Sequence, residues 1–249
     1  MKILNLYAGI GGNRKLWGDE HDITAIELDP CIAAIYQDFY PNDTVVVGDA
    51  HQYLLEHFRE FDFVWSSPPC PTHGAYRYNI GFRAKGYAPV FPDMKLYEEI
   101  IFLQHYYEGR WVVENVRPYY KPLIEPTVTL QRHLLWSNFP IAYKKFEAKG
   151  IGIKNKISDY AESGFDIIGS DINNKRQVLR NCVDPGLGLH ILSELLKGEK
   201  SISKTVICQD CSGQGGDREN GPYCHKCDGL GEVSAPKEKK TNSKPERKD

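Results

Sequence analysis

Two reactive side chains follow apolar runs, where an α/β enzyme keeps its reacting groups. The run 61–65 leads through two serines into Pro68, Pro69 and Cys70. Consecutive prolines cannot supply the donors of a β-ladder, so the chain must leave its strand there. In the same way the run 111–113 leads into Glu114. The sequence therefore predicts a thiol nucleophile and an acid on neighbouring strand ends.

A glycine-rich segment near the N-terminus favours a bound nucleoside. Residues 6–12 lie between a predicted strand and a helix-like segment, where glycines let a cofactor approach the backbone. Glu27, at the end of the next strand, is placed to accept hydrogen bonds from a ribose. Asp49, at the end of the third strand, is placed to bind an adenine amino group. Tight βα packing alone would explain the glycines, but three such strand ends in order favour a cofactor.

These residues must be positioned by alternating strands and helices. The sequence predicts strands at 3–8, 23–27, 44–47, a fourth ending at Cys70, and 111–113. It predicts helices at 30–39, 52–58, 95–107 and 176–196, and a polar, aromatic loop at 71–92. This order predicts a Rossmann-like, doubly wound, mostly parallel sheet with ligands at the strand carboxyl ends.

Composition restricts the function classes. The 249 residues are 41% hydrophobic and 26% charged, which is typical of a soluble globular chain. No apolar run approaches the roughly 20 residues that cross a bilayer, so we expect no membrane partner. The N-terminus lacks a signal-peptide pattern, so we expect a cytoplasmic location. A net charge of −2 argues against a DNA-packing protein but allows an enzyme with a basic cleft.

The order of several motifs resembles the DNA cytosine-5 methyltransferases. The resemblance rests on Tyr7-Ala8-Gly9-Ile10-Gly11-Gly12, Glu27, Gly48-Asp49, Pro68-Pro69-Cys70 and Glu114-Asn115-Val116. Segment 93–99 is similar to the stretch after that family's catalytic loop, and segment 176–185 to its closing motif. The resemblance covers 1–140 and 175–198 and implies a class I S-adenosylmethionine-dependent methyltransferase domain.

The resemblance also implies a chemistry and its residues. Cys70 would attack carbon 6 of cytosine, Glu114 would hold ring nitrogen 3 and the exocyclic amine, and Arg132 would contact the flipped base or its phosphate. The acceptor would be duplex DNA with its target base flipped out. The methyl donor would be S-adenosylmethionine, bound by Tyr7, Ala8, Gly9, Gly11, Gly12, Glu27, Leu28, Asp49, Ala50, Pro68, Asn181 and Val183.

The chain departs from the family pattern at several positions. Pro71 replaces a glutamine, Asn5 an aspartate, Arg180 a glycine and Asp184 a proline, and the segment around Arg132 lacks one arginine. Residues 141–174 are far shorter than the usual target-recognition domain. We therefore expect a short or degenerate DNA site, as in compact methyltransferases of bacteriophage and bacterial mobile DNA, and a phage-infected or bacterial host cell.

The C-terminal part predicts a structural zinc site. Residues 199–233 hold two copies of Cys-x-x-Cys-x-Gly-x-Gly, whose thiolates are Cys208, Cys211, Cys224 and Cys227. Four such thiolates complete a tetrahedral Zn²⁺ site with no open position. The pattern resembles the zinc ribbon of DnaJ-type cochaperones, which leaves a protein partner open. The Lys/Glu/Pro-rich tail, 234–249, is predicted to be disordered.

Other functions remain open from the sequence alone. A regulator that binds S-adenosylmethionine without catalysis would keep the same cofactor loop. An RNA cytosine methyltransferase would also use Cys70, although the Cys-Phe-Thr signature of the related tRNA enzymes is absent. Cys70 itself has the alternative interpretation of a buried small hydrophobe, the common fate of a free cysteine.

Overall fold

The structure is a computed structural model that describes residues 1–146, 164–167, 169, 170, 172, 174–202, 205–207 and 232–234. The side chains of 198–207 and 232–234 are not described. The chain divides into two compact units, Met1–Leu195 and Leu196–Asp249. The first holds every residue predicted for catalysis or cofactor binding. In the second, β8 (Thr205–Ile207) pairs with β9 (Glu232–Ser234) in antiparallel fashion.

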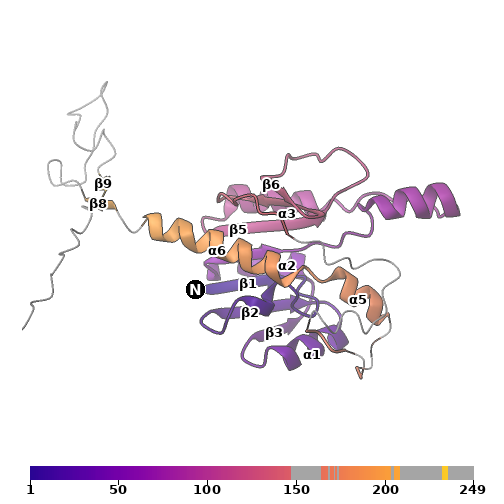
Figure 1. The fold of residues 1–249 in the computed structure, drawn as a ribbon, viewed down its shortest axis with the longest axis horizontal. Helices are drawn as coiled ribbons and strands as arrows, with labels where there is room; N and C mark the ends of the chain where they lie inside the picture. Colours follow the sequence, from indigo (N-terminus) through magenta and orange to yellow (C-terminus); the bar gives the residue numbers. More distant parts are fainter. Residues whose placement is uncertain are drawn as a thin grey trace, which may run out of the picture. The chain divides into compact units, whose positions relative to one another are not determined.

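Within the described residues of the first unit, one seven-stranded sheet has the order β3-β2-β1-β4-β5-β7-β6 (Figure 1). Its strands are β1 (Lys2–Leu6), β2 (Asp22–Glu27), β3 (Thr44–Val47), β4 (Phe63–Ser66), β5 (Arg110–Val116), β6 (Val128–Leu130) and β7 (His133–Ser137). The first five are parallel, and β7 runs antiparallel between β5 and β6. This confirms the predicted Rossmann-like, mostly parallel fold class.

The strand order reverses direction between β1 and β4. From β1 the chain builds outward through β2 and β3, and then returns to pair β4 with the other edge of β1. In open α/β sheets the crevice at such a switch point, outside the strand carboxyl ends, is the usual ligand site. The segments that leave β1 and β4 there are the glycine-rich loop and the loop that carries Cys70.

Helices cover both faces of the sheet. They are α1 (Pro30–Phe39), α2 (Ala50–His57), α3 (Lys95–Tyr106), α5 (Lys175–Asn181) and α6 (Pro185–Ile202), with the short helices η1 (Arg14–Leu16), η2 (Phe58–Glu60) and η3 (Arg77–Ala84, a π-helix). Asp29 and Asp49 start α1 and α2 by accepting hydrogen bonds from backbone N–H groups of the first turn. No helix of the described ranges is long and apolar enough to cross a membrane.

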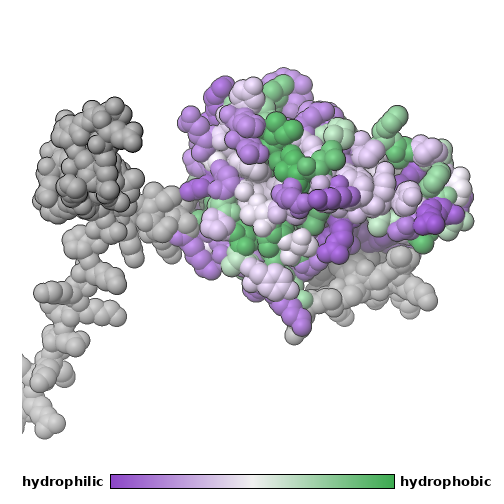
Figure 2. All heavy atoms as spheres, turned by 90° about the horizontal axis from the view of Figure 1, so that it is seen from above, coloured by the Kyte–Doolittle hydropathy of each residue, from purple (hydrophilic) through white to green (hydrophobic). Residues whose placement is uncertain are grey.

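The core follows the alternation of the strands. Leu4, Leu6 and Val64 pack on one face with Leu54 of α2 and Ile100 of α3. On the other face, alternate strand residues such as Ala25 pack against α1. Fully burying a side chain of this size contributes about 1.5–3 kcal/mol. The face of the described part that Figure 2 draws carries both hydrophilic residues and groups of hydrophobic ones.

Several predicted boundaries were wrong. Glu114 lies inside β5, not at its end, because the unpredicted strand β7 extends the pairing and places Leu135 opposite it. β4 ends at Ser66, so Cys70 lies in the loop beyond the strand. The predicted loop 71–92 contains η3. The single helix predicted over 176–196 is interrupted at 182–184 and resumes at Pro185, which favours a first helical turn.

Most of the predicted insertion 141–174 lies outside the described residues. Where it is described, Phe165 and Ile167 are buried with Ile10 and with Ile35 of α1. Lys15 lies over the ring of Phe165, 4.0 Å from its centroid. These two residues of the insertion are therefore part of the core of the first unit.

Candidate active site

A cavity of about 840 Å³ opens at the carboxyl ends of β1 and β4. It brings together residues that the sequence assigns to catalysis and cofactor binding, although they come from seven separate stretches of the chain. The lining includes Tyr7, Ala8, Gly9, Gly12, Glu27, Leu28, Asp49, Ala50, Pro68, Cys70, Glu114, Arg132, Asn181 and Val183. Of the predicted site residues in the described part, Gly11 does not line it.

The glycine-rich loop needs glycine for two different reasons. Gly9 has a φ of +55°, and a Cβ atom there would meet no atom within 4 Å, so its backbone faces open space. Gly11 has a φ of +79°, and a Cβ atom there would lie 2.3 Å from the ring of Tyr40. Gly11 therefore allows the loop to pack closely against Tyr36 and Tyr40 at the end of α1. Gly9, in contrast, leaves the backbone open to a ligand.

Glu27 is held rigidly at the rim of the cavity. Its carboxylate accepts hydrogen bonds from the N–H groups of Gly9 (2.9 Å) and Asp29 (3.0 Å). The adjacent Leu28 is 70% exposed although it is apolar, and it lines the same cavity. A fixed carboxylate acceptor beside an open apolar side chain and an unobstructed glycine fits the hydroxyls and the flat base of a nucleoside.

Asp49 caps the N-terminus of α2, a role that the sequence analysis did not predict. Its side chain accepts hydrogen bonds from the N–H groups of His51 (2.8 Å) and Gln52 (3.2 Å). Lys95 lies 3.4 Å from its other oxygen. The Gln52 N–H above all, and the Lys95 charge, hold the pKa of Asp49 below its ordinary value. Its carboxylate therefore faces the cavity as an anion.

The loop of Cys70 is fixed by hydrogen bonds from both sides. Asn115 donates from Nδ2 to the carbonyl of Pro68 (2.9 Å), so β5 holds the segment that follows β4. The N–H groups of His73 and Gly74 donate to the carbonyl of Cys70, at 3.0 and 3.1 Å. The Asn115 of the Glu-Asn-Val motif is thus a positioning residue for the cysteine.

The Cys70 sulfur is a protonated thiol in this environment. Burial raises the pKa of the Cys70 thiol, and the negative charge of Glu114 raises it further. Arg132 and Arg180 act in the opposite direction. Cys70, Glu114, Arg132 and Arg180 all line the same cavity.

Glu114 is one end of a hydrogen-bond chain that the sequence did not predict. It is 5% exposed, and His133, 4% exposed, donates to it from Nδ1. That tautomer follows because Arg132 donates from Nε to Nε2 of His133 (3.2 Å). Burial would raise the pKa of the Glu114 carboxyl, but His133, Ser67 and Arg132 together lower it below the ordinary value. Glu114 is therefore an ionised acceptor.

A second buried network lies under the cofactor loop. Glu99 of α3 is 1% exposed and accepts hydrogen bonds from the hydroxyls of Tyr7 (2.5 Å) and Ser66 (2.5 Å). His51 Nδ1 lies 3.0 Å from the same carboxylate, which raises the pKa of His51. Tyr7 has a φ of 56°, an uncommon conformation for a bulky residue. Only the acidic residue in an otherwise buried helical face could have signalled this network in the sequence.

The closing segment, residues 181–188, packs directly against the backbone of the cofactor loop at Gly12 and Asn13. A Cβ atom on Gly12 would lie 2.5 Å from the carbonyl oxygen of Val183, and one on Gly188 would lie 2.2 Å from the carbonyl oxygen of Asn13. Asn5 is satisfied by a reciprocal amide pair with Asn13, in which Asn13 Nδ2 donates at 2.8 Å. Asp184 accepts from the N–H of Leu187 and starts α6. Two of the departures from the family pattern thus have structural roles.

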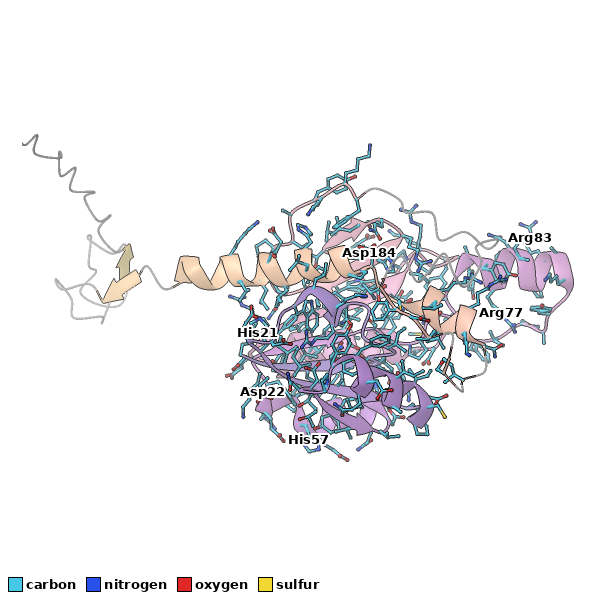
Figure 3. The ribbon with its side chains drawn as sticks, turned by 60° about the horizontal axis from the view of Figure 1, so that its bottom comes forward. His21, Asp22, His57, Arg77, Arg83 and Asp184 are labelled. Carbon is cyan, nitrogen blue, oxygen red and sulfur yellow. The ribbon has the colours of Figure 1, made fainter. Side chains whose placement is uncertain are left out.

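The aromatic and basic segment after Cys70 forms one side of the cavity mouth. Arg77 donates to the carbonyl of Ala88 (2.9 Å) and lies over the ring of Tyr87. Arg77 and Tyr87 both line the cavity. Figure 3 shows Arg77 and Arg83 on η3, which projects from the body of the first unit. The predicted zinc ligands lie outside the described residues, and within those residues no group of His, Cys, Asp and Glu could hold a metal ion.

Comparisons with known proteins find likeness in structure only. No protein-family model matches the chain, and no curated protein matches it. A DNMT2 mutant from Spodoptera frugiperda aligns at 23% identity and a TM-score of 0.32, covering 46% of this chain and 35% of that one. A TehB-like SAM-dependent methyltransferase from Corynebacterium glutamicum aligns at 22% and 0.29, covering 46% and 54%. NSun6 from Pyrococcus horikoshii aligns at 17% and 0.35, covering 48% and 35%.

These alignments span between about a third and a half of the length of the three proteins. At such identities and TM-scores they assign neither a substrate nor an activity to this chain. What the site can do follows from its own geometry. It joins a nucleoside-sized space, an ionised buried carboxylate and a cysteine thiol in one cavity of a Rossmann-like sheet.

Proposed function

We propose that the protein is an S-adenosylmethionine-dependent methyltransferase that acts on carbon 5 of cytosine in duplex DNA. The observation that carries the proposal is that Cys70 and Glu114 line the same cavity as the glycine-rich loop, Glu27 and Leu28. A nucleophile and an acceptor for a base edge thus share one space with groups suited to a nucleoside.

The residues would divide the binding of the cofactor between them. The carboxylate of Glu27 suits the ribose hydroxyls, and Leu28 and Ala50 offer apolar surface for the adenine. Gly9, which has no side chain, leaves open space beside its backbone, and Pro68, Asn181 and Val183 also line the cavity. When bound, S-adenosylmethionine supplies an electrophilic methyl group on a sulfonium.

Cys70 and Glu114 would activate the base. Carbon 5 of cytosine is a poor nucleophile, and addition of the Cys70 sulfur to carbon 6 makes carbon 5 part of an electron-rich enamine. Glu114 accepts hydrogen bonds from protonated ring nitrogen 3 and from the exocyclic amine, which stabilises the developing charge. Carbon 5 would then take the methyl group. Loss of the proton from carbon 5, expulsion of the Cys70 sulfur as thiolate and release of the proton from ring nitrogen 3 would restore the aromatic base.

The same contact supplies a way to ionise the nucleophile. In the free site burial raises the pKa of the Cys70 thiol, and the negative charge of Glu114 raises it further. Once Glu114 hydrogen-bonds a protonated base edge, that charge is offset and the thiolate becomes easier to form. The nucleophile is therefore activated only when a cytosine is in place.

Transfer of labelled methyl from S-adenosylmethionine tests the proposal. We expect label at carbon 5 of cytosine in duplex DNA with the natural protein and none with Cys70→Ala. Transfer to RNA but not to DNA would change the substrate class. Cofactor binding without transfer to DNA or RNA of varied sequence would support a non-catalytic regulator instead.

We further propose that Cys208, Cys211, Cys224 and Cys227 bind one structural Zn²⁺ ion. The support is the repeated Cys-x-x-Cys-x-Gly-x-Gly spacing.

The short insertion 141–174 supports recognition of a short or degenerate DNA site, which sequencing of the methylated positions would test.

A further inference from the structure

The end of the cavity around Cys70 is lined by arginines. Arg77, Arg117, Arg132 and Arg180 all contribute to the lining. Among the described residues, none of these four forms an ion pair with a carboxylate, although other cations of the chain such as Arg14 and Lys95 do. Unpaired guanidinium groups gathered at one end of a cavity favour an anionic ligand.

Four acidic residues line the cavity: Glu27, Asp49, Asp93 and Glu114. Asp93 accepts a hydrogen bond from the N–H of Lys95 (3.1 Å). Glu27 is bound to backbone N–H groups of the cofactor loop, and Asp49 caps α2 and faces Lys95. Glu114 is the acidic group beside Cys70, and its partner is His133. Glu114, the carboxylate beside Cys70, offsets one of the four arginine charges, and the remaining positive charge is available to an anion.

Arg132 and Arg180 are joined in one arrangement. Arg132 donates from Nη2 to the backbone carbonyl of Arg180 (2.9 Å) and from Nε to His133. Arg180 stands in the last turn of α5, where carbonyl groups lack helical partners and attract cations. The hydrogen bond from Arg132 to the Arg180 carbonyl holds the end of α5 at the cavity. Arg180 lines the same cavity as Cys70, and its positive charge acts to lower the pKa of the thiol.

We propose that Arg180, with Arg132, forms a phosphate subsite beside Cys70 that binds the phosphate of the nucleotide being modified. This inference rests on the proposed function, because a base bound at Cys70 and Glu114 carries its phosphate to the neighbouring rim. A guanidinium presents its donors in a fork that matches two phosphate oxygens. The family pattern has glycine at position 180, so this contact is a feature of this chain and not of the resemblance.

Binding experiments test the subsite without requiring catalysis. The change is Arg180→Gln, and the matched control is Arg176→Gln, because Arg176 is an exposed arginine of the same helix that does not line the cavity. The affinity of the full chain for a cytosine-containing oligonucleotide is measured by fluorescence anisotropy over a range of salt concentrations. The slope of log K against log salt is negative, and the loss of one phosphate contact makes it less steep by about 0.9 for duplex DNA.

We expect Arg180→Gln to weaken oligonucleotide binding roughly tenfold or more, since hydrogen bonds to charged groups contribute about 1.5–3 kcal/mol. The salt slope should become less steep by about one, Arg180→Lys should retain the slope, and Arg176→Gln should leave affinity and slope unchanged. Affinity for S-adenosylmethionine should be the same in all variants. Equal losses in the Arg180 and Arg176 variants, or no loss in either, would overturn the subsite.

Deoxycytidine monophosphate as competitor distinguishes the two sources of the phosphate. Competition by this free nucleotide that is lost in Arg180→Gln would assign the subsite to a mononucleotide acceptor. Binding of the oligonucleotide alone, dependent on Arg180, would assign it to a polynucleotide backbone. Arg180-dependent binding in a protein that transfers no methyl group would overturn the proposed function and leave the subsite standing. Methyl transfer at the same rate in Arg180→Gln as in the natural protein would overturn the subsite and leave the proposed function standing.

Discussion

At the scale of single residues, the ionisation states of Cys70 and Glu114 are coupled. Glu114 stays ionised in spite of its burial because His133, Ser67 and Arg132 lower the pKa of its carboxyl. The resulting negative charge adds to burial in raising the pKa of the Cys70 thiol. A resting site of this kind protects the nucleophile from alkylation and oxidation, since the thiolate is the reactive form.

Alkylation by iodoacetamide measures this coupling. We expect Cys70 to react slowly at neutral pH, with a midpoint above that of an ordinary thiol. Glu114→Gln removes the charge that raises the pKa, so its midpoint should fall and its reaction at neutral pH should be severalfold faster. Arg132→Gln should move the midpoint upward. Peptide-level mass spectrometry separates Cys70 from Cys182, whose pKa is raised by burial to about 12.

The same Glu114→Gln variant should transfer no methyl group at a measurable rate, because the amide cannot offset the charge that develops on the base. Faster alkylation together with lost transfer is the signature of a carboxylate that acts on both partners. An unchanged alkylation midpoint in Glu114→Gln would contradict the coupling.

His133 should set the acid limit of activity. His133→Phe removes a donor that lowers the pKa of Glu114, so the carboxyl should protonate at higher pH than in the natural protein. Methyl transfer should then be lost at a higher pH as the solution is acidified. His133→Asn, which keeps a donor, should restore part of the profile. Coincident acid limits in the natural protein and in His133→Phe would show that His133 has only a packing role.

At the scale of elements, the cofactor loop and the closing segment touch through their backbones. Gly12→Ala should destabilise the first unit by about 1–3 kcal/mol, because its Cβ atom would lie 2.5 Å from the carbonyl oxygen of Val183. Gly48→Ala is the control, since a Cβ atom there would meet nothing within 4 Å. Urea unfolding midpoints of the two variants compare the costs. Equal midpoints would mean that the contact is not maintained in solution.

The elements also show how far sequence patterns reach. Strands β1 to β3 and helix α1 were predictable because apolar runs alternate with capping and turn residues such as Asp29-Pro30 and Gly48-Asp49. The antiparallel strands β6 and β7 were not, since they are short, the polar residues Gln131 and Arg132 separate them, and β7 begins with His133. Without β7 the burial of Glu114 and its bond to His133 have no signal in the sequence.

At the scale of the whole molecule, topology explains why the sequence could group residues that line one cavity. Residues that follow β1, β2, β3 and β4 must meet at one edge of a parallel sheet, so motif order alone brings Gly9, Glu27, Asp49 and Cys70 together. Long-range side-chain partnerships, such as Tyr7 with Glu99 or Arg132 with Arg180, depend on three-dimensional packing and leave no local pattern.

The second unit makes a separate prediction about metal. The full chain should contain one Zn²⁺ per molecule, and Cys208→Ser with Cys211→Ser should abolish it, as measured by elemental analysis. Because a closed structural site supplies folding energy to its own module, the double variant should gain protease cleavage sites after residue 199 while the first unit keeps its unfolding midpoint. Retention of zinc in the double variant would contradict the assignment of the ligands.

The central claim is that Cys70 becomes covalently bonded to carbon 6 of a cytosine. An oligonucleotide with fluorine at carbon 5 of the target cytosine tests it directly, because fluorine cannot leave as a proton does and the adduct remains. Intact mass and peptide mapping, in the presence of S-adenosylmethionine, should show a one-to-one adduct at Cys70 that is absent in Cys70→Ala. Methylation of ordinary cytosine with no trapped adduct, or an adduct at another residue, would contradict the account.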